Sequence, residues 1–222
     1  MTVFKKSFIP PEFNEKEILR YALCQKADEN ITALLDECIG ECENAFTYNV
    51  CWCEMPVKIT NGEIDLSFLK TDSKALSKNL SGCEKIILFG ATVGIGIDRL
   101  IAKYGRISPS KAVLFQAIGA ERIEALCNAF NEEVTEKYRK ENLYTRPRFS
   151  PGYGDFPLDA QRDIFRVLDC YRQIGLSLSD SLLMSPSKSV TAIIGISDKK
   201  TECKIPCSDC TKSNCTFRRN EQ

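Results

Sequence analysis

Apolar residues recur at helical spacing in two segments near the start of the chain. Asn14 followed by Glu17 three residues later has the spacing of a capping box, so a helix is expected to begin here. A second apolar stripe runs from Ile31 to Cys42, and its steps of three or four residues predict another helix. The two segments predict an N-terminal pair of helices.

Two longer helices are predicted in the second half of the chain. Ser108–Pro109 has the pattern of an N-cap followed by a first-turn proline. A long helix is expected over about residues 120–141, on a stripe formed by Ile123, Leu126, Phe130, Val134 and Tyr138. Residues 159–174 predict a further helix that Gly175 would end, with an apolar face of Ile164, Leu168, Tyr171 and Ile174.

Strand patterns lie between and after these helices. Val57 to Leu66 alternates around Asn61–Gly62, which predicts a tight β-hairpin. Lys85–Phe89 is expected to be a buried strand, and Ser189–Ser197 alternates as a strand of the central sheet. Asp72 is expected to cap a short helix between the hairpin and the first of these strands.

Composition indicates one soluble, globular domain. The 222 residues suffice for a sizeable core, and 43% are hydrophobic and 27% charged. Thirty basic side chains balance thirty acidic ones, so we expect neither nucleic acid nor an anionic membrane as a partner. No long apolar segment follows the first lysines, so no secretory signal is expected. The longest nearly apolar run, Ile86–Ile97, is too short to cross a bilayer.

The chain contains no histidine. This excludes Ser-His-Asp and Cys-His nucleophile systems, and it excludes a histidine general base. It also excludes the two-histidine triads that bind iron. An enzyme built from this sequence would need little proton transfer, or would use Tyr, Lys, Cys or carboxylates.

Glycines between Gly90 and Asp98 follow a predicted strand. Glycine-rich loops at helix starts can bind phosphate, but the spacing here is not that of a dinucleotide-binding fingerprint. A tight strand-to-helix turn with close packing is the favoured interpretation.

Twelve cysteines without a secretory signal favour a reducing compartment, which we expect to be the cytoplasm. Four of them lie close together near the C-terminus, at Cys203, Cys207, Cys210 and Cys215. Such a cluster suits a tetrahedral site for zinc or an iron–sulfur cluster. The alternative is a tail of reduced thiols without a metal. The other cysteines fall mostly on predicted apolar faces and are expected to be buried.

Residues 146–157 are rich in proline and glycine and predict an irregular loop. Within it, Arg148 offers a planar fork suited to a carboxylate, and Tyr153 offers a ring face and a hydroxyl. Together they suit the zwitterionic amino-acid end of a ligand. Structural loops commonly carry the same residue types, so both interpretations stay open on chemistry alone.

The run from Arg148 to Tyr153, Arg-Phe-Ser-Pro-Gly-Tyr, resembles the Arg-x-x-Pro-Gly-Tyr motif of the activation domain of cobalamin-dependent methionine synthase. Three later segments, Ile174–Ser181, Met184–Pro186 and Ser189–Val190, resemble further segments of that family in the same order. The preceding helix resembles the acidic helix that comes before the motif. The resemblance covers roughly residues 117–196.

The resemblance implies an α+β fold with helices around a twisted antiparallel sheet, which agrees with the predicted elements. Residues 1–198 would form this domain, and residues 199–222 would form a cysteine-rich tail. The first hundred residues match only loosely, and no counterpart of the family's N-terminal aspartate segment is found.

The resemblance also implies a site for S-adenosylmethionine. Arg148 and Tyr153 would contact this ligand, with backbone groups of Ser150 and Gly152 beside it. An acidic side chain of the long helix would also line the site, and the candidates are Glu124 and Glu121.

The implied function is reactivation of cobalamin. A corrinoid in the Co(II) state gains one electron, from a flavodoxin or a ferredoxin, and then accepts a methyl group from S-adenosylmethionine. The sequence contains no cobalamin module, so the chain is expected to act in trans on a methionine synthase or another corrinoid protein, within a methyltransferase system of methionine biosynthesis. Two alternatives remain: a non-catalytic module that binds S-adenosylmethionine or a corrinoid protein, and a zinc ribbon that binds nucleic acid through the tail.

Overall fold

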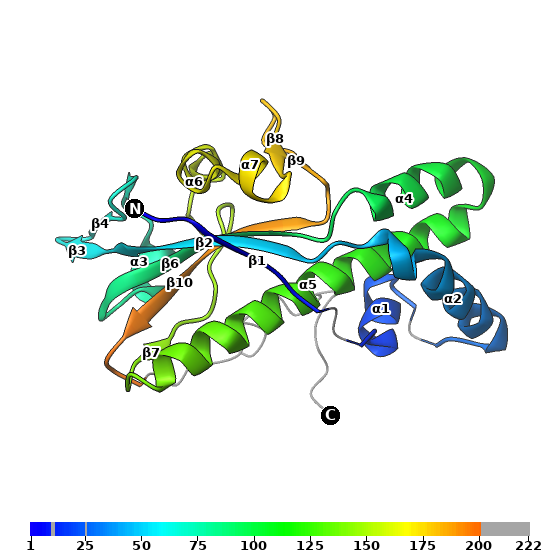
Figure 1. Cartoon of the computed structure of the whole chain (residues 1–222), viewed down its shortest axis with the longest axis horizontal. Helices are drawn as coiled ribbons and strands as arrows, with labels where there is room; N and C mark the ends of the chain where they lie inside the picture. Colours follow the sequence, from blue (N-terminus) through cyan, green and yellow to red (C-terminus); the bar gives the residue numbers. More distant parts are fainter. Residues whose placement is uncertain (10–11, 25, 201–222) are drawn as a thin grey trace.

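The computed structural model describes residues 1–9, 12–24 and 26–200 of the chain. Its main sheet has five antiparallel strands in the order β1-β2-β6-β10-β7. The bounds of these strands are β1 Phe4–Ser7, β2 Asn49–Pro56, β6 Cys83–Thr92, β10 Ser189–Ser197 and β7 Tyr144–Thr145. The long strand β6 lies in the middle and pairs with β2 on one side and β10 on the other (Figure 1).

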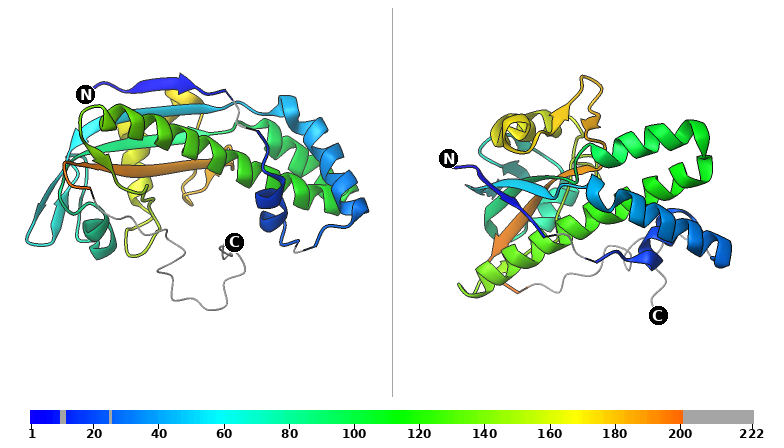
Figure 2. Two further views of the ribbon diagram at one scale, coloured as in Figure 1. Left: turned by 90° about the horizontal axis from the view of Figure 1, so that it is seen from below. Right: turned by 45° about the vertical axis from the view of Figure 1, so that its right-hand side comes forward.

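Helices cover both faces of this sheet. The long helix α5 (Pro109–Arg139) crosses one face, and α6 (Ala160–Leu168) and α7 (Cys170–Ile174) cover the other (Figure 1). Three more helices pack against α5 or beside it, as the views in Figure 2 show: α1 (Glu15–Tyr21), α2 (Glu29–Cys42) and α4 (Gly96–Ile107). The molecule is thus an α+β sandwich of helices around a curled antiparallel sheet.

Shorter elements decorate the ends of the sheet. A three-stranded sheet consists of β3 (Lys58–Thr60), β4 (Glu63–Asp65) and β5 (Lys70–Thr71). It leads into the short helix α3 (Lys74–Asn79). The remaining elements are the 3-10 helix η1 (Glu43–Ala45) and a two-stranded ribbon of β8 (Ser177–Leu178) and β9 (Met184–Ser185).

Alternation along β6 divides the core into two halves. Ile87 and Phe89 point toward α5, whereas Ile86 and Leu88 point toward α6 and α7. All four side chains are buried, because helices cover both faces. The strand therefore reads as a nearly continuous apolar run rather than as an alternating one.

Several predicted elements are confirmed. Asn14 caps α1 by accepting a hydrogen bond from the backbone N–H of Glu17 at 3.2 Å. The stripe over α2, the hairpin at Asn61–Gly62 and the late strand β10 are present as expected. Gly175 ends α7 in the left-handed conformation, with a φ of 68°.

The prediction of one continuous helix over residues 159–174 is wrong in one respect. It is broken at Asp169, whose φ of 47° is left-handed and ends α6 at Leu168. The break rotates the following turn, so Tyr171 is 72% exposed instead of lying on the apolar face.

Two helix starts also differ from the expectation. The cap of α3 is Ser73, whose hydroxyl accepts from the N–H of Leu76 at 3.1 Å, and not Asp72. Helix α5 begins at Pro109 after Ser108, which confirms the pattern of N-cap and first-turn proline, but it runs without a break into the segment expected as a separate helix from about residue 120. Neither β1 nor β2 was predicted.

The segment between Gly90 and Asp98 is a tight strand-to-helix connection. Strand β6 continues to Thr92 and α4 begins at Gly96. A Cβ atom on Gly96 would lie 2.0 Å from the carbonyl oxygen of Ala45, so close packing alone accounts for this glycine.

Candidate ligand-binding site

A cleft of about 530 Å³ lies between α1 and α5. Its volume falls in the range of about 300–1,000 Å³ that is usual for small-molecule sites. The lining comes from α1, from the segment before it and from one face of α5: Glu12, Asn14, Glu17, Tyr21, Glu121, Glu124, Ala125, Asn128, Ala129 and Glu132.

The α5 wall is a polar stripe along a helix that buries a different, apolar face in the core. Glu121, Glu124, Asn128 and Glu132 follow one another at steps of three and four residues, which places them on one face. Leu126 and Phe130 point instead into the core. This stripe was visible in the sequence, but only its first two members were proposed as site residues.

The α1 wall is held against α5 by the buried side chain of Ile18. Within this wall, Arg20 forms an ion pair with Glu17 at 2.7 Å. Burial, and then the nearby negative charge of Glu124, raise the pKa of the Tyr21 phenol, so Tyr21 remains neutral at physiological pH. The α1 side chains thus offer the Glu17 carboxylate and the Tyr21 phenol to the cleft.

Arg148, in the irregular loop after α5, does not line the cleft but bonds to two residues that do. Its Nη2 donates to Glu124 Oε2 at 2.5 Å, and its Nη1 donates to Asn128 Oδ1 at 2.9 Å. Both partners line the cleft. The side chain of Arg148 is only 22% exposed, so its guanidinium is held at the cleft edge by two defined bonds.

The backbone of the loop is pinned to the sheet directly after Arg148. Phe149 and Ile193 exchange two backbone hydrogen bonds of 2.8 and 2.9 Å, which joins the loop to β10. Gly152 has a φ of 83°, a conformation that favours glycine. The Tyr153 ring packs edge-on against the Phe149 ring, with centroids 5.7 Å apart.

Asp155 ties the end of the loop to α3. Its carboxylate accepts from the Ser73 hydroxyl and from the backbone N–H groups of Lys74 at 2.8 Å and Ala75 at 3.1 Å. The bond from Ser73 is the main cause that lowers the pKa of Asp155, and the two backbone bonds add to it. The loop that presents Arg148 is thereby fixed at both ends.

The predicted site residues fall into two groups. Glu121 and Glu124 line the cleft, and Arg148 is bonded to two lining residues. Ser150, Gly152 and Tyr153 are not among the described residues that line it, and Tyr153 is 62% exposed. The lining residues from α1 and from the segment before it were not proposed from the sequence, because only the packing of α1 against α5 brings them to the cleft.

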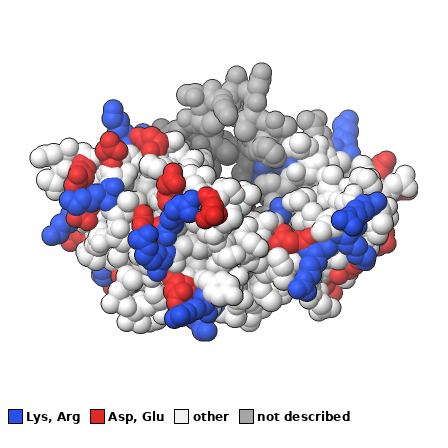
Figure 3. Space-filling view, turned by 90° about the horizontal axis from the view of Figure 1, so that it is seen from above, with Lys and Arg blue, Asp and Glu red and all other residues white. Residues whose placement is uncertain are grey.

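The glutamates of the cleft outnumber the arginines that form ion pairs with them. Five of its ten lining residues are glutamates. Three of them pair with arginines: Glu17 with Arg20, Glu121 with Arg122 and Glu124 with Arg148. No ion pair within the described part of the chain involves the other two, Glu12 and Glu132. By contrast, the face that carries α6 and α7 shows basic and acidic side chains in mixed groups (Figure 3).

The four tail cysteines proposed as metal ligands, Cys203, Cys207, Cys210 and Cys215, lie outside the described residues. Within residues 1–200, apart from the three that are not described, no group of three or more His, Cys, Asp or Glu side chains is arranged to hold a metal ion. In the same part of the chain, none of the helices has both the length and the apolar composition needed to span a membrane.

Comparison with solved structures defines the class of fold. A crystal structure described as the MetH reactivation domain bound to AdoHcy is similar to this chain, with a TM-score of 0.63 and 14% sequence identity. The similarity covers 90% of this chain and 80% of that one. The chain therefore has the fold of a reactivation domain.

Sequence comparison gives the family. Residues 75–206 match the family described as vitamin B12 dependent methionine synthase, activation domain. The chain belongs to this family, as the motif from Arg148 to Tyr153 had indicated. None of the curated proteins matches the sequence.

Proposed function

We propose that this chain binds S-adenosylmethionine in the cleft between α1 and α5 and supports the reductive methylation of cobalamin on a separate methionine synthase. Membership of the activation-domain family supports this proposal. The structurally similar reactivation domain was crystallised with AdoHcy, which is S-adenosylmethionine without its transferable methyl group.

The observation that carries the proposal is the pairing of Arg148 with Glu124 at the edge of an acidic cleft. S-adenosylmethionine has one carboxylate and two cations, an ammonium and a sulfonium. Its carboxylate fits the fork of Arg148, and its ammonium fits the carboxylate of Glu124. The excess negative charge of the cleft favours a ligand that carries a net positive charge.

The loop after Arg148 would contact the rest of the ligand. Backbone groups of Ser150 and Gly152 lie next to Arg148 in the chain, and the exposed ring of Tyr153 offers an apolar face with a hydroxyl. We propose that these groups meet the ligand where it leaves the cleft. Arg148 would hold one end of the methyl donor, and the loop would aim the other end.

The proposed reaction requires the protein mainly to position the methyl group relative to cobalt. Cobalt in the Co(II) state gains one electron to become Co(I). The Co(I) electron pair then forms the Co–CH₃ bond, while the sulfur–methyl bond breaks and its electrons stay on sulfur. No proton moves, so a chain without histidine is suited to this reaction. A flavodoxin or ferredoxin would supply the electron, in the cytoplasm where this reduced chemistry persists.

Methyl transfer in trans tests the proposal. The protein is mixed with a Co(II) corrinoid protein that lacks an activation domain, a strong reductant and S-adenosylmethionine labelled in its methyl group. Label on the cobalamin is expected only when all components are present. Binding without transfer would leave a non-catalytic binding module, and absence of both binding and transfer would refute the proposal.

A further inference from the structure

Arg122 is the largest fully buried side chain of the described residues, and it does not line the cleft. Its neighbour Glu121 does line it. The two side chains form parallel bonds, from Nε to Oε2 at 2.5 Å and from Nη2 to Oε1 at 2.6 Å. Burial disfavours the charge on Arg122, but the bonds and charge of Glu121, together with the Tyr48 phenol, outweigh it and raise the pKa of the guanidinium.

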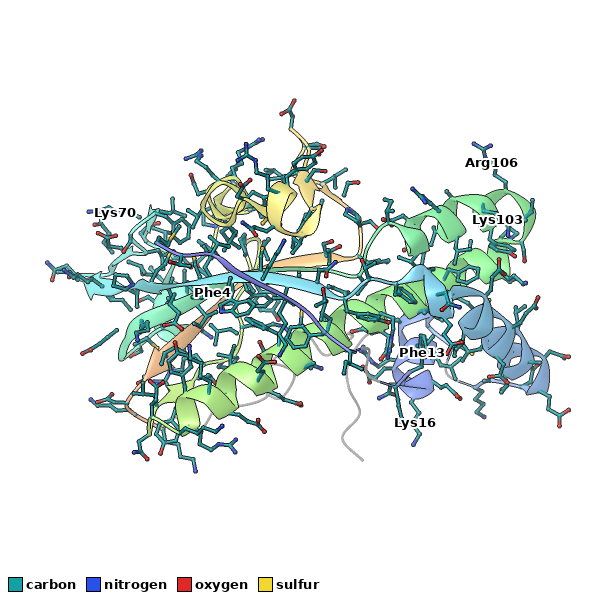
Figure 4. The ribbon with its side chains drawn as sticks, in the orientation of Figure 1. Phe4, Phe13, Lys16, Lys70, Lys103 and Arg106 are labelled. Atoms are coloured by element: carbon teal, nitrogen blue, oxygen red, sulfur yellow. The ribbon has the colours of Figure 1, made fainter. Side chains whose placement is uncertain are left out.

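The same guanidinium also binds the segment that precedes α1. Nη2 donates to the backbone carbonyl of Glu12 at 2.7 Å. The Phe13 ring lies over the guanidinium, 4.1 Å from Cζ to the ring centroid. Phe13 is labelled in Figure 4, at the approach to α1 beside α5. One buried side chain of α5 thus bonds to both walls of the cleft, to Glu121 on one and to Glu12 on the other.

We propose that Arg122 is a positioning residue, which sets the width of the cleft by fastening Glu12–Asn14 to α5. Asn14 caps α1, so the position of this segment also fixes where α1 begins. Ile18 attaches the middle of α1 to the core, and its backbone N–H donates to the Asn14 carbonyl at 2.9 Å, but that bond lies within the first turn of α1 and does not reach α5. The proposal rests on the proposed function, because its ligand measurement uses S-adenosylmethionine.

The test replaces the buried ion pair by neutral side chains of similar size. Arg122→Met alone would leave the Glu121 carboxylate buried without a counter-charge and is prone to unfold. The double variant Glu121→Gln/Arg122→Met removes both charges. Glu121→Gln alone keeps the bond from the guanidinium to Glu12 but leaves that buried cation without its counter-charge, so urea unfolding first establishes that each variant is folded. Val134→Ala, a core truncation in the C-terminal part of α5, controls for loss of stability.

Two readouts are expected to change together. The double variant should bind S-adenosylmethionine at least about tenfold more weakly than Glu121→Gln does. Amide exchange at Glu17 and Ile18, whose N–H groups donate to Asn14, should accelerate at least about tenfold without ligand. Arg122→Lys, which keeps one charged donor, should fall between the wild type and the double variant. Val134→Ala should change neither readout.

Unchanged affinity and unchanged exchange at Glu17 and Ile18 in the double variant would overturn the role of Arg122. If the wild type does not bind S-adenosylmethionine, the proposed function fails, and the exchange measurement still decides whether Arg122 holds the segment. The two failures are therefore distinguishable.

Discussion

Arg148 and Glu124 are joined by an ion pair of 2.5 Å, which links the irregular loop to helix α5 at the edge of the cleft. An amino-acid zwitterion carries the same two charges as this pair. Its carboxylate can take the place of Glu124 on Arg148, while its ammonium takes the place of Arg148 on Glu124. The pair therefore provides a matched exchange site for the amino-acid end of a ligand.

Neutralising Glu124 should weaken binding of S-adenosylmethionine. A hydrogen bond to a charged group contributes about 1.5–3 kcal/mol, so Glu124→Gln should cost roughly tenfold or more in affinity by calorimetry. Glu136→Gln is the matched control, because Glu136 is exposed on the same helix outside the cleft. An equal loss in both variants would show a general charge effect and contradict the role of Glu124.

Glu132 should distinguish the methyl donor from its product. S-adenosylmethionine has a sulfonium that S-adenosylhomocysteine lacks, and Glu132 is a cleft residue without an ion pair among the described residues. Because Glu132 is exposed, Glu132→Gln should weaken the binding of S-adenosylmethionine only about two- to fivefold at low salt. The effect should fade at high salt, and S-adenosylhomocysteine should be little affected. Equal weakening of the two ligands at low salt would rule out this charge preference.

Local sequence signals predicted the elements that local interactions control. Asn14 and Glu17 marked the start of α1, and Asn61–Gly62 marked the hairpin. The left-handed conformation of Asp169 was missed, because no glycine marks that position and the apolar spacing continues through it.

The same distinction between local signals and tertiary packing applies to the candidate site. The motif and the acidic helix identified Arg148 and Glu124, which the structure brings into contact. The opposite wall could not be predicted, because the contact of Glu12 and Tyr21 with the cleft depends on how α1 packs across α5. Spacing within one helix carries no information about which other helix faces it.

Asp155 should stabilise the fold in a pH-dependent manner. Its bonds to Ser73 and to two backbone N–H groups lower its pKa below the ordinary value of 3.8. The stabilisation is therefore complete above that value and is lost as the pH falls through the lower pKa of the folded state. Asp155→Asn should reduce the free energy of unfolding at pH 7, and the difference from wild type should shrink below about pH 4.

Urea unfolding from pH 7 down to pH 3 measures this difference. Asp159→Asn is the control, since the Asp159 side chain is 80% exposed and makes no cap bond. A deficit of Asp155→Asn that stays constant over the whole pH range would contradict the assignment.

The spacing of the four tail cysteines predicts a bound metal. We predict about one equivalent of zinc, or an iron–sulfur cluster, in anaerobically purified protein. Replacing Cys203, Cys207, Cys210 and Cys215 by serine should remove it, whereas Cys24→Ser should not. A cluster would give a brown protein with visible absorbance and could pass the electron to cobalt. Stoichiometric zinc would exclude that electron role, and metal-free wild-type protein would contradict the prediction.

Direct binding of S-adenosylmethionine by wild type and Arg148→Ala tests the central claim. Loss of two charge-assisted bonds should weaken binding by roughly a hundredfold. Arg172→Ala, with an exposed arginine on α7, should bind as wild type does. Equal affinity of wild type and Arg148→Ala, or no binding by the wild type, would contradict the account.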